Sequence, residues 1–288
     1  MNEAKDYGLQ IGLVPTMGAL HEGHLSLIER ALKENDLVVV SLFVNPIQFN
    51  NKEDLEKYPR TIEKDLVLIK SLELRVKSEA KAKELLAFTP TVDEMYPQGE
   101  PKEVYHFGPI EEVMEGPRRP GHFSGVAVVV RRLFDLAQPT RAYFGEKDYQ
   151  QIAVIRNLLK QIKYPIELVP CPIVRADDGL ALSSRNMRLS PAARAMAPAI
   201  NATLEQAAEM AEYEEVDDVK EWVLDTLASW HEVNDCPDGL CFEPEYFEIV
   251  DAITLQPIAD WDDAEQNGAV GCIAVWLDGV RLIDIVKF

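Results

Sequence analysis

Short apolar, β-branched runs alternate with longer segments of helical periodicity through the first 170 residues of this 288-residue chain. The clearest run is Leu37–Val44 (LVVVSLFV), which is almost continuously apolar, as expected for a parallel strand that is covered on both faces. Such alternation is typical of βαβ units, in which each crossover helix leads into another parallel strand. We therefore predict an α/β fold with a doubly wound parallel sheet.

The same patterns give the approximate bounds of the elements before residue 170. The predicted strands are Leu9–Val14, Leu37–Val44, Leu85–Phe88, Ala142–Phe144 and Ile166–Val169. The predicted helices are Leu25–Asn35, Thr61–Glu84, Val126–Ala137 and Asp148–Gln161.

The sequence pattern changes near Val174. Ser190 and Pro191 have the features of an N-cap and a first helical position, and they open an Ala-rich helix. A further helix, Asp217–Trp230, precedes two predicted strands, Tyr246–Val250 and Ala269–Leu277. We therefore expect two domains, 1–175 and a smaller α+β domain, 176–288.

Charge is distributed unevenly between these two parts. The chain carries 29 basic and 49 acidic side chains, a net charge of −20, which disfavours nucleic acid and anionic membranes as partners. Residues 1–189 hold 25 basic and 27 acidic side chains, whereas residues 190–288 hold 4 and 22. The first part is nearly neutral and could bind an anion, and the acidic part is expected to be solvated.

Cysteine spacing and hydropathy indicate the cellular compartment. The four cysteines form no CxxC pair, and the chain is too long to need disulfides, so we expect a reducing cytoplasm. The first ten residues, MNEAKDYGLQ, have no apolar core, so we expect no signal peptide. No run approaches the roughly 18 apolar residues of a membrane span.

The first candidate site is Pro15–His24, between a predicted strand and a predicted helix. Ligands bind at this edge of an open α/β sheet, and the helix offers free N–H groups to an anion. Gly18 and Gly23 allow close approach of the backbone. His21 and His24, three residues apart, would share a helical face and could donate hydrogen bonds during phosphoryl transfer.

Other interpretations of the same residues remain open. The spacing His21-Glu22-Gly23-His24 differs from the zinc motif H-E-x-x-H, which disfavours a zinc site, and the two histidines could be structural. The chain has neither a Walker A motif nor G-x-G-x-x-G, so a nucleotide would have to be held in another way.

Two further segments have the composition of phosphate sites. In Phe144–Gln151, Lys147 stands at a helix N-terminus, against the dipole preference, which suggests a bound polyphosphate or a surface pair with Glu146 or Asp148. Leu182–Arg188 combines serine hydroxyls with arginines, although it could equally be a polar loop.

A fourth segment, Asn45–Phe49, follows the buried strand and carries two amides, on Asn45 and Gln48. Amides at the same sheet edge as the histidines can fix the orientation of a small polar substrate. A phosphorylated substrate would instead need arginine or lysine there.

Six strings together resemble one family: PTMGALHEGH, SLFVNPIQF, YPRT, RPGHFSGV, FGEKDYQQ and DGLALSSRN. In this order and spacing they are similar to the pantothenate synthetases, or pantoate–β-alanine ligases, of the HxGH nucleotidylyltransferase superfamily. The resemblance implies a Rossmann-like first domain, a C-terminal lid domain and a cytoplasmic homodimer. It also implies a ligase that makes pantothenate, a coenzyme A precursor, through pantoyl adenylate, releasing pyrophosphate and AMP.

The resemblance also implies the residue roles. The implied catalytic residues are His24, as general acid, with His21, Lys147 and Arg185. The implied ATP-binding residues are Met17, Gly18, Ala19, Leu20, His21, Glu22, Gly23, His24, Gly145, Glu146, Lys147, Asp148, Val174, Leu182, Ser183, Ser184 and Arg185. Those implied for pantoate and β-alanine are Gln48, Gln151 and Asn45.

The implied cofactor is Mg²⁺, bound with ATP, and Asp65 is a candidate for its outer shell. Zinc, nicotinamide and flavin are not expected. Two departures from the family pattern bear on stability: few residues precede Ile11, and Leu72–Phe88 is long and charged.

Three other functions are weighed against this one. A plain nucleotidylyltransferase would share the histidines but would need cations near Asn45 and Gln48 for a phosphorylated acceptor. A zinc-dependent hydrolase would use His21 and His24 as ligands and would contain stoichiometric zinc. A non-catalytic relative is disfavoured because the histidines, Lys147 and Arg185 are all present.

Overall fold

The computed structural model describes residues 7–233, 236 and 239–288. The expectation of no signal peptide rests on the first ten residues, of which 1–6 lie outside the described part. The chain forms two compact units. The first contains Met1–Glu111, Gly116–Glu146 and Gln151–Pro172, and the second contains Glu112–Glu115, Lys147–Gln150 and Ile173–Phe288. Two short segments that the sequence pattern places in the first domain therefore belong to the second unit.

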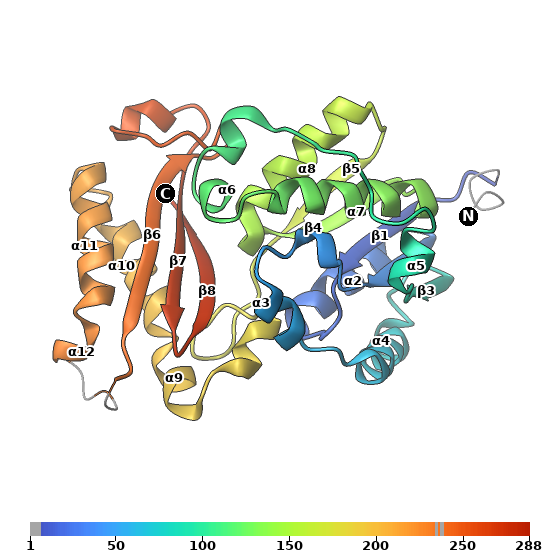
Figure 1. The fold of residues 1–288 in the computed structure, drawn as a ribbon, viewed down its shortest axis with the longest axis horizontal. Helices are drawn as coiled ribbons and strands as arrows, with labels where there is room; N and C mark the ends of the chain where they lie inside the picture. Colours follow the sequence, from blue (N-terminus) through green and yellow to red (C-terminus); the bar gives the residue numbers. More distant parts are fainter. Residues whose placement is uncertain (1–6, 234–235, 237–238) are drawn as a thin grey trace. The chain divides into compact units, whose positions relative to one another are not determined.

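A five-stranded sheet forms the centre of the first unit (Figure 1). Its strands are β1 (Ile11–Thr16), β2 (Leu37–Leu42), β3 (Glu84–Phe88), β4 (Arg141–Gly145) and β5 (Glu167–Cys171). They pair in parallel in the order β3-β2-β1-β4-β5. All residues of β2 are buried, which explains its unbroken apolar sequence. The predicted doubly wound sheet is confirmed.

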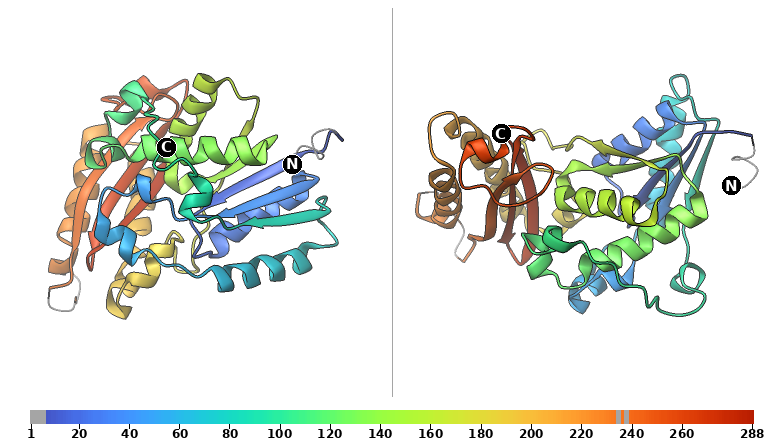
Figure 2. Two further views of the ribbon diagram at one scale, coloured as in Figure 1. Left: turned by 45° about the vertical axis from the view of Figure 1, so that its right-hand side comes forward. Right: turned by 90° about the horizontal axis from the view of Figure 1, so that it is seen from above.

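Helices cover both faces of this sheet (Figure 2). Helices α7 (His122–Ala137) and α8 (Tyr149–Ile162) pack in one apolar core, with Ile11 and Leu13 of β1. Helices α2 (Glu22–Glu34) and α4 (Ile62–Val76) pack in the other, with Val14. Alternate residues of β1 therefore enter opposite cores, as the pleat of a strand requires.

Helix α4 is shorter than the predicted helix Thr61–Glu84, because the chain after Val76 leaves the helix for tertiary hydrogen bonds. The N–H groups of Lys81 and Ala82 donate to the Leu32 carbonyl, and that of Lys83 donates to Asp36. Short helices not predicted from the sequence are α3 (Lys52–Lys57), α5 (Val92–Met95) and α6 (Glu115–Arg118).

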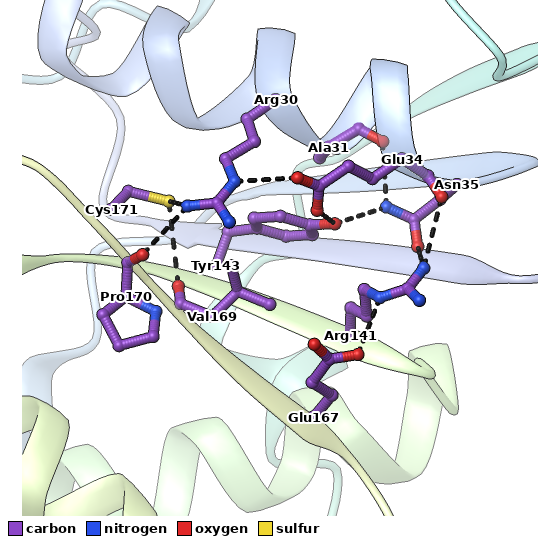
Figure 3. A network of polar contacts seen from close by, with 10 residues as sticks. All are labelled: Arg30, Ala31, Glu34, Asn35, Arg141, Tyr143, Glu167, Val169, Pro170 and Cys171. Atoms are coloured by element: carbon purple, nitrogen blue, oxygen red, sulfur yellow. Dashed lines mark hydrogen bonds and ion pairs between the residues drawn. The ribbon is translucent and has the colours of Figure 1, made fainter.

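A polar network ties the C-terminal end of α2 to β4 and β5 (Figure 3). Tyr143, fully buried on β4, donates its O–H to Glu34 at 2.8 Å and accepts from the Asn35 amide at 2.7 Å. Arg30 donates to Glu34 and to the Pro170 carbonyl. Helix α2 is thus fixed at this end by hydrogen bonds as well as by apolar packing.

The second unit contains a three-stranded antiparallel sheet in the order β6-β7-β8. Its strands are β6 (Phe242–Asp251), β7 (Ala269–Leu277) and β8 (Val280–Lys287). Helices α10 (Ala199–Met210) and α11 (Val216–Ala228) pack against it in one apolar core, and α9 (Pro191–Met196) and α12 (Trp230–Val233) are short. The sequence pattern did not predict β8.

The predicted cap of the Ala-rich helix is confirmed, since the Ser190 hydroxyl accepts from the Ala193 N–H and Pro191 follows it. The helix is shorter than the Ala-rich sequence, because Pro198 separates α9 from α10. Within the described part of the chain, none of the helices is long and apolar enough to cross a membrane.

Candidate functional site

The loop after β1 is held in an unusual backbone conformation by a buried carboxylate. Gly18 and Ala19 both have left-handed backbone angles, with φ of +78° and +50°, which costs free energy at the alanine. The Asp65 side chain, 1% exposed, accepts hydrogen bonds from the Ala19 and Leu20 N–H groups at 2.9 Å each. Thr61 donates to the same carboxylate. Asp65 therefore fixes the loop from α4.

A second set of hydrogen bonds fixes the start of this loop against β2. The Thr16 hydroxyl donates to the Ser41 carbonyl at 2.7 Å and accepts from the Gly18 N–H at 3.1 Å. The loop is therefore held on both sides before α2 begins.

The two histidines stand at the N-terminus of α2. His21 is the N-cap residue, and the His21 and His24 ring centroids are 4.0 Å apart. The structure thus brings the two imidazoles together beside the first N–H groups of the helix. Such a terminus favours a bound anion, because its N–H groups and the helix dipole both present positive charge.

The two amides follow β2, in the turn that contains the short 3-10 helix Pro46–Gln48. Asn45 and Gln48 are 1% and 9% exposed. The Asn45 amide nitrogen donates to Gln48 Oε1 at 3.2 Å, and Gln48 Nε2 lies 3.0 Å from the Met17 sulfur. The structure therefore joins the amide pair to the loop after β1.

Helix α7 packs directly on this turn. A Cβ at Gly125 would lie 2.6 Å from the Ile47 carbonyl oxygen, so only glycine allows this approach. His122 Nδ1 lies 2.8 Å from the Gln48 carbonyl oxygen. The backbone of the turn is thereby fixed from the helix side.

The remaining candidates of the first unit follow β4. Gly145 ends that strand and Glu146 follows it, while Gln151 lies in the first turn of α8. Strand β4 pairs with β1, so the two carboxyl ends are neighbours where the strand order reverses. Ligands of open α/β sheets bind at this switch point.

The candidates of the second unit form two groups. Lys147 Nζ lies 3.6 Å from Asp148 Oδ2, with the lysine side chain 18% exposed. The pair is too long for a strong hydrogen bond, and the lysine is more buried than its partner. The distance is nevertheless short enough for an ion pair, so pairing with Asp148, one of the alternatives predicted for Lys147, is present in the structure.

The other group lies on two hydrogen-bonded segments. The Leu182 N–H donates to the Val174 carbonyl at 3.0 Å. Ser183 caps the 3-10 helix Ser184–Arg188 by accepting from the Arg185 N–H. The predicted ATP residues Val174 and Leu182 to Arg185 are thus held together.

A buried ion-pair network anchors the Lys147 segment. Gln150 Oε1 accepts from the Glu115 N–H at 3.0 Å, and its Nε2 donates to the Val113 carbonyl at 2.9 Å. Glu115 accepts two hydrogen bonds from Arg281 of β8, at 2.7 and 2.9 Å, and one from Tyr246 of β6. Lys147–Gln150 is therefore linked through Glu115 to the C-terminal sheet.

Asp65, the residue predicted for the outer shell of a metal ion, is engaged by the loop after β1. Among the residues that the structure describes, no group of three His, Cys, Asp or Glu side chains is placed to hold a metal ion. Both Asp65 oxygens accept hydrogen bonds from backbone N–H groups of the loop, and Thr61 donates a further one. The observed role of this carboxylate is therefore to hold the loop. Mg²⁺ is commonly held by substrate phosphates, and an outer-shell role for Asp65 stays a prediction.

Asp65→Asn tests the loop anchor. The new NH₂ group would face a backbone N–H and leave a buried donor without an acceptor. For ATP, the ligand that the sequence resemblance implies, we expect KM to rise about tenfold. Glu63→Gln, an exposed substitution on the same helix, is the matched control. Steady-state kinetics with varied ATP measures both, and equal KM values would contradict the anchoring role.

Sequence reasoning missed Tyr96 and assigned no task to Gly125 or His122. Tyr96 lies in an irregular segment without periodicity, and its O–H donates to Asn45 Oδ1 at 2.9 Å. The contact joins residues 51 positions apart, so no local pattern could have revealed it.

Comparison with known proteins gives one consistent result. The family model for pantoate-beta-alanine ligase matches residues 1–287. The pantothenate synthetase of Phocaeicola vulgatus is 48% identical over 289 aligned positions, covering 100% of this chain and 95% of that protein. The enzyme of Porphyromonas gingivalis strain W83 is 48% identical, covering 99% and 94%.

Solved structures agree. The pantothenate synthetase of Thermus thermophilus superposes with a TM-score of 0.84 at 44% identity, covering 96% of this chain and 93% of that one. The pantoate-beta-alanine ligase of Francisella tularensis, solved with a form of ATP and β-alanine, gives a TM-score of 0.74 at 32% identity, with coverage of 97% and 90%.

Proposed function

This chain belongs to the pantoate–β-alanine ligase family, and we propose that its residues perform the ATP-dependent condensation of pantoate with β-alanine in two steps. In the first step the pantoate carboxylate attacks the α-phosphate of ATP, and pyrophosphate leaves. In the second step the β-alanine amine attacks the acyl carbon of pantoyl adenylate, the amide bond forms, and AMP leaves with the release of one proton.

One observation carries the proposal: a helix N-terminus with two histidines stands at the sheet edge that also carries a buried amide pair. The first step joins two anions, so it requires positive charge and hydrogen-bond donors in place of water. In the proposal, His24 is the general acid for phosphoryl transfer, and His21 and the α2 N–H groups bind the phosphates. The loop from Met17 to Glu22, with Gly23, contacts ATP.

Residues of the second unit supply the remaining charge in this proposal. Lys147 and Arg185 neutralise the phosphates in this proposal, since each side chain can donate charge-assisted hydrogen bonds to phosphate oxygens. Further ATP contacts are assigned to Gly145, Glu146, Asp148, Val174, Leu182, Ser183 and Ser184.

The amides and Gln151 are proposed to bind the second pair of substrates. Gln48, with Asn45, would contact pantoate and β-alanine, and Gln151 would hold pantoate. Uncharged amides suit a hydroxy acid that must lose its negative charge on activation, because a cation there would stabilise the ground state as much as the transition state. A phosphorylated acceptor would instead need arginine or lysine at this turn.

Three wider features complete the proposal. Mg²⁺ bound with ATP adds positive charge at the phosphates. Residues 176–288 act as a lid, since an acyl adenylate must be shielded from water. The enzyme is a homodimer, which light scattering tests by particle mass, and it works in the cytoplasm, where the four free thiols suit the reducing conditions.

The test is an exchange assay on the purified protein. With Mg-ATP, pantoate and β-alanine, we expect equimolar AMP and pantothenate. Without β-alanine, turnover should stop, while labelled pyrophosphate still enters ATP at a rate that depends on pantoate. AMP formation that does not depend on pantoate would overturn the mechanism. Pantothenate formation without exchange of labelled pyrophosphate into ATP would rule out the adenylate as an intermediate.

A further inference from the structure

The direction of the Gln48 amide decides which substrate groups it can bind. A glutamine side chain offers an oxygen acceptor on one side and N–H donors on the other, and only the N–H side can meet a carboxylate. In the structure, Gln48 Oε1 accepts from Asn45 at 3.2 Å, while Nε2 is directed to the Met17 sulfur at 3.0 Å. Asn45 therefore sets the direction of Gln48.

The direction of Asn45 is in turn fixed by two groups of defined polarity. Its Nδ2 also donates to the Gly125 carbonyl at 3.2 Å, and a carbonyl can only accept. Its Oδ1 accepts from the Tyr96 O–H at 2.9 Å. A reversed Asn45 amide would place its oxygen against the Gly125 oxygen, so both contacts favour one orientation.

Tyr96 is well suited to act as a permanent donor. It is 7% exposed, and burial raises the pKa of its phenol, so the hydroxyl stays protonated at any pH at which the enzyme works. Its ring packs edge-on against Phe43, with centroids 6.1 Å apart, and its backbone N–H donates to the Val92 carbonyl of α5. Ring and backbone are thus both held.

We propose that Tyr96 is a positioning residue for the condensation: through Asn45 it holds the Gln48 amide with Nε2–H toward the oxygen atoms of the hydroxy acid. The chain of donors runs from the Tyr96 O–H to Asn45 Oδ1, and from Asn45 Nδ2 to Gln48 Oε1. Tyr96 acts through Asn45 and Gln48. This inference rests on the proposed function, since it takes pantoate as the ligand of Gln48.

Tyr96→Phe removes the donor and keeps the ring. A misdirected Gln48 would lose its hydrogen bond to the pantoate carboxylate. We therefore expect KM for pantoate to rise about tenfold, while KM for ATP and kcat change less than about twofold. Titration calorimetry of pantoate binding should show the same loss of affinity. A rise in KM for pantoate alone indicates that Tyr96 positions Gln48, whereas a general loss of structure would raise KM for ATP as well.

Tyr143→Phe is the matched control. Tyr143 is also buried in the first unit and also pairs with an asparagine, Asn35, but at the C-terminal end of α2 (Figure 3). We expect this variant to lose thermal stability without a selective change in KM for pantoate. A selective rise in that control would overturn the inference.

Asn45→Asp is a second test of the inference, and it can be made even if the Tyr96→Phe variant does not fold. A carboxylate has no N–H to give, so Gln48 would turn its Nε2 toward position 45 and its oxygen toward the substrate. We expect KM for pantoate to rise more than in Tyr96→Phe. An unchanged KM for pantoate, or equal rises in KM for pantoate and KM for ATP, would overturn the inference. A wild-type protein that makes no pantothenate would overturn the proposed function itself.

Discussion

Replacement of His24 by alanine is expected to lower kcat about 100-fold or more, with the fold retained. The imidazole stands at the start of α2, 4.0 Å from the His21 ring centroid, where charge would develop during adenylation. Loss of one group that stabilises a transition state costs about 100-fold or more in other enzymes. Pantothenate formation under saturating substrates measures the effect.

His106→Ala is the control for this experiment. The His106 side chain is 80% exposed, lies beside Glu111, and has no role assigned in the reaction. We expect a near-normal kcat for His106→Ala. The unfolding curves of His106→Ala and His24→Ala should both match that of the parent protein. A rate near normal in His24→Ala would remove the proposed role of this residue.

Arg281→Met is expected to destabilise the second unit by about 3–5 kcal/mol, because it leaves the buried Glu115 carboxylate without its cation. The two side chains are 17% and 9% exposed and form a bidentate pair. Both Arg281 and Glu115 are thus largely removed from water. All four tryptophans lie between residues 222 and 276, so tryptophan fluorescence during urea unfolding reports this unit.

Arg194→Met provides the comparison. Arg194 and Asp178 form a similar bidentate pair, but their side chains are 35% and 45% exposed, and exposed pairs contribute less than about 1 kcal/mol. The double variant Arg281→Met/Glu115→Gln removes the uncompensated charge and should recover part of the loss. Equal effects of the two single arginine substitutions would contradict the role of burial.

The central sheet could be predicted because its sequence signal is local. Strand β2 is buried on both faces, so its residues must be apolar, and that run is visible without any knowledge of the fold. Strand β8 carries Arg281 and Asp284, whose partners Glu115 and Arg175 come from 166 and 109 residues away. A buried charge is balanced by a distant residue, so local hydropathy cannot identify such a strand.

The candidate site also combines residues that a local sequence pattern identifies with residues whose roles depend on distant partners. The glycines, histidines and amides could be chosen from the sequence because they occur directly after strands, where the parallel fold brings them to one edge. The anchoring role of Asp65 and the contact of Tyr96 with Asn45 depend on how α4 and the chain after α5 pack. The sequence therefore suggests Asp65 as a metal residue, whereas in the structure its carboxylate accepts hydrogen bonds from the backbone of the loop.

The link from Lys147–Gln150 through Glu115 to Arg281 also sets an order of events during synthesis. Lys147 is made before Arg281, and the two positions are 134 residues apart. Chains are built from the N-terminus and begin to fold as they emerge. A nascent chain therefore holds Lys147–Gln150 without its link to Arg281 until β8 has been made, and a fragment that stops at residue 175 would never acquire that link.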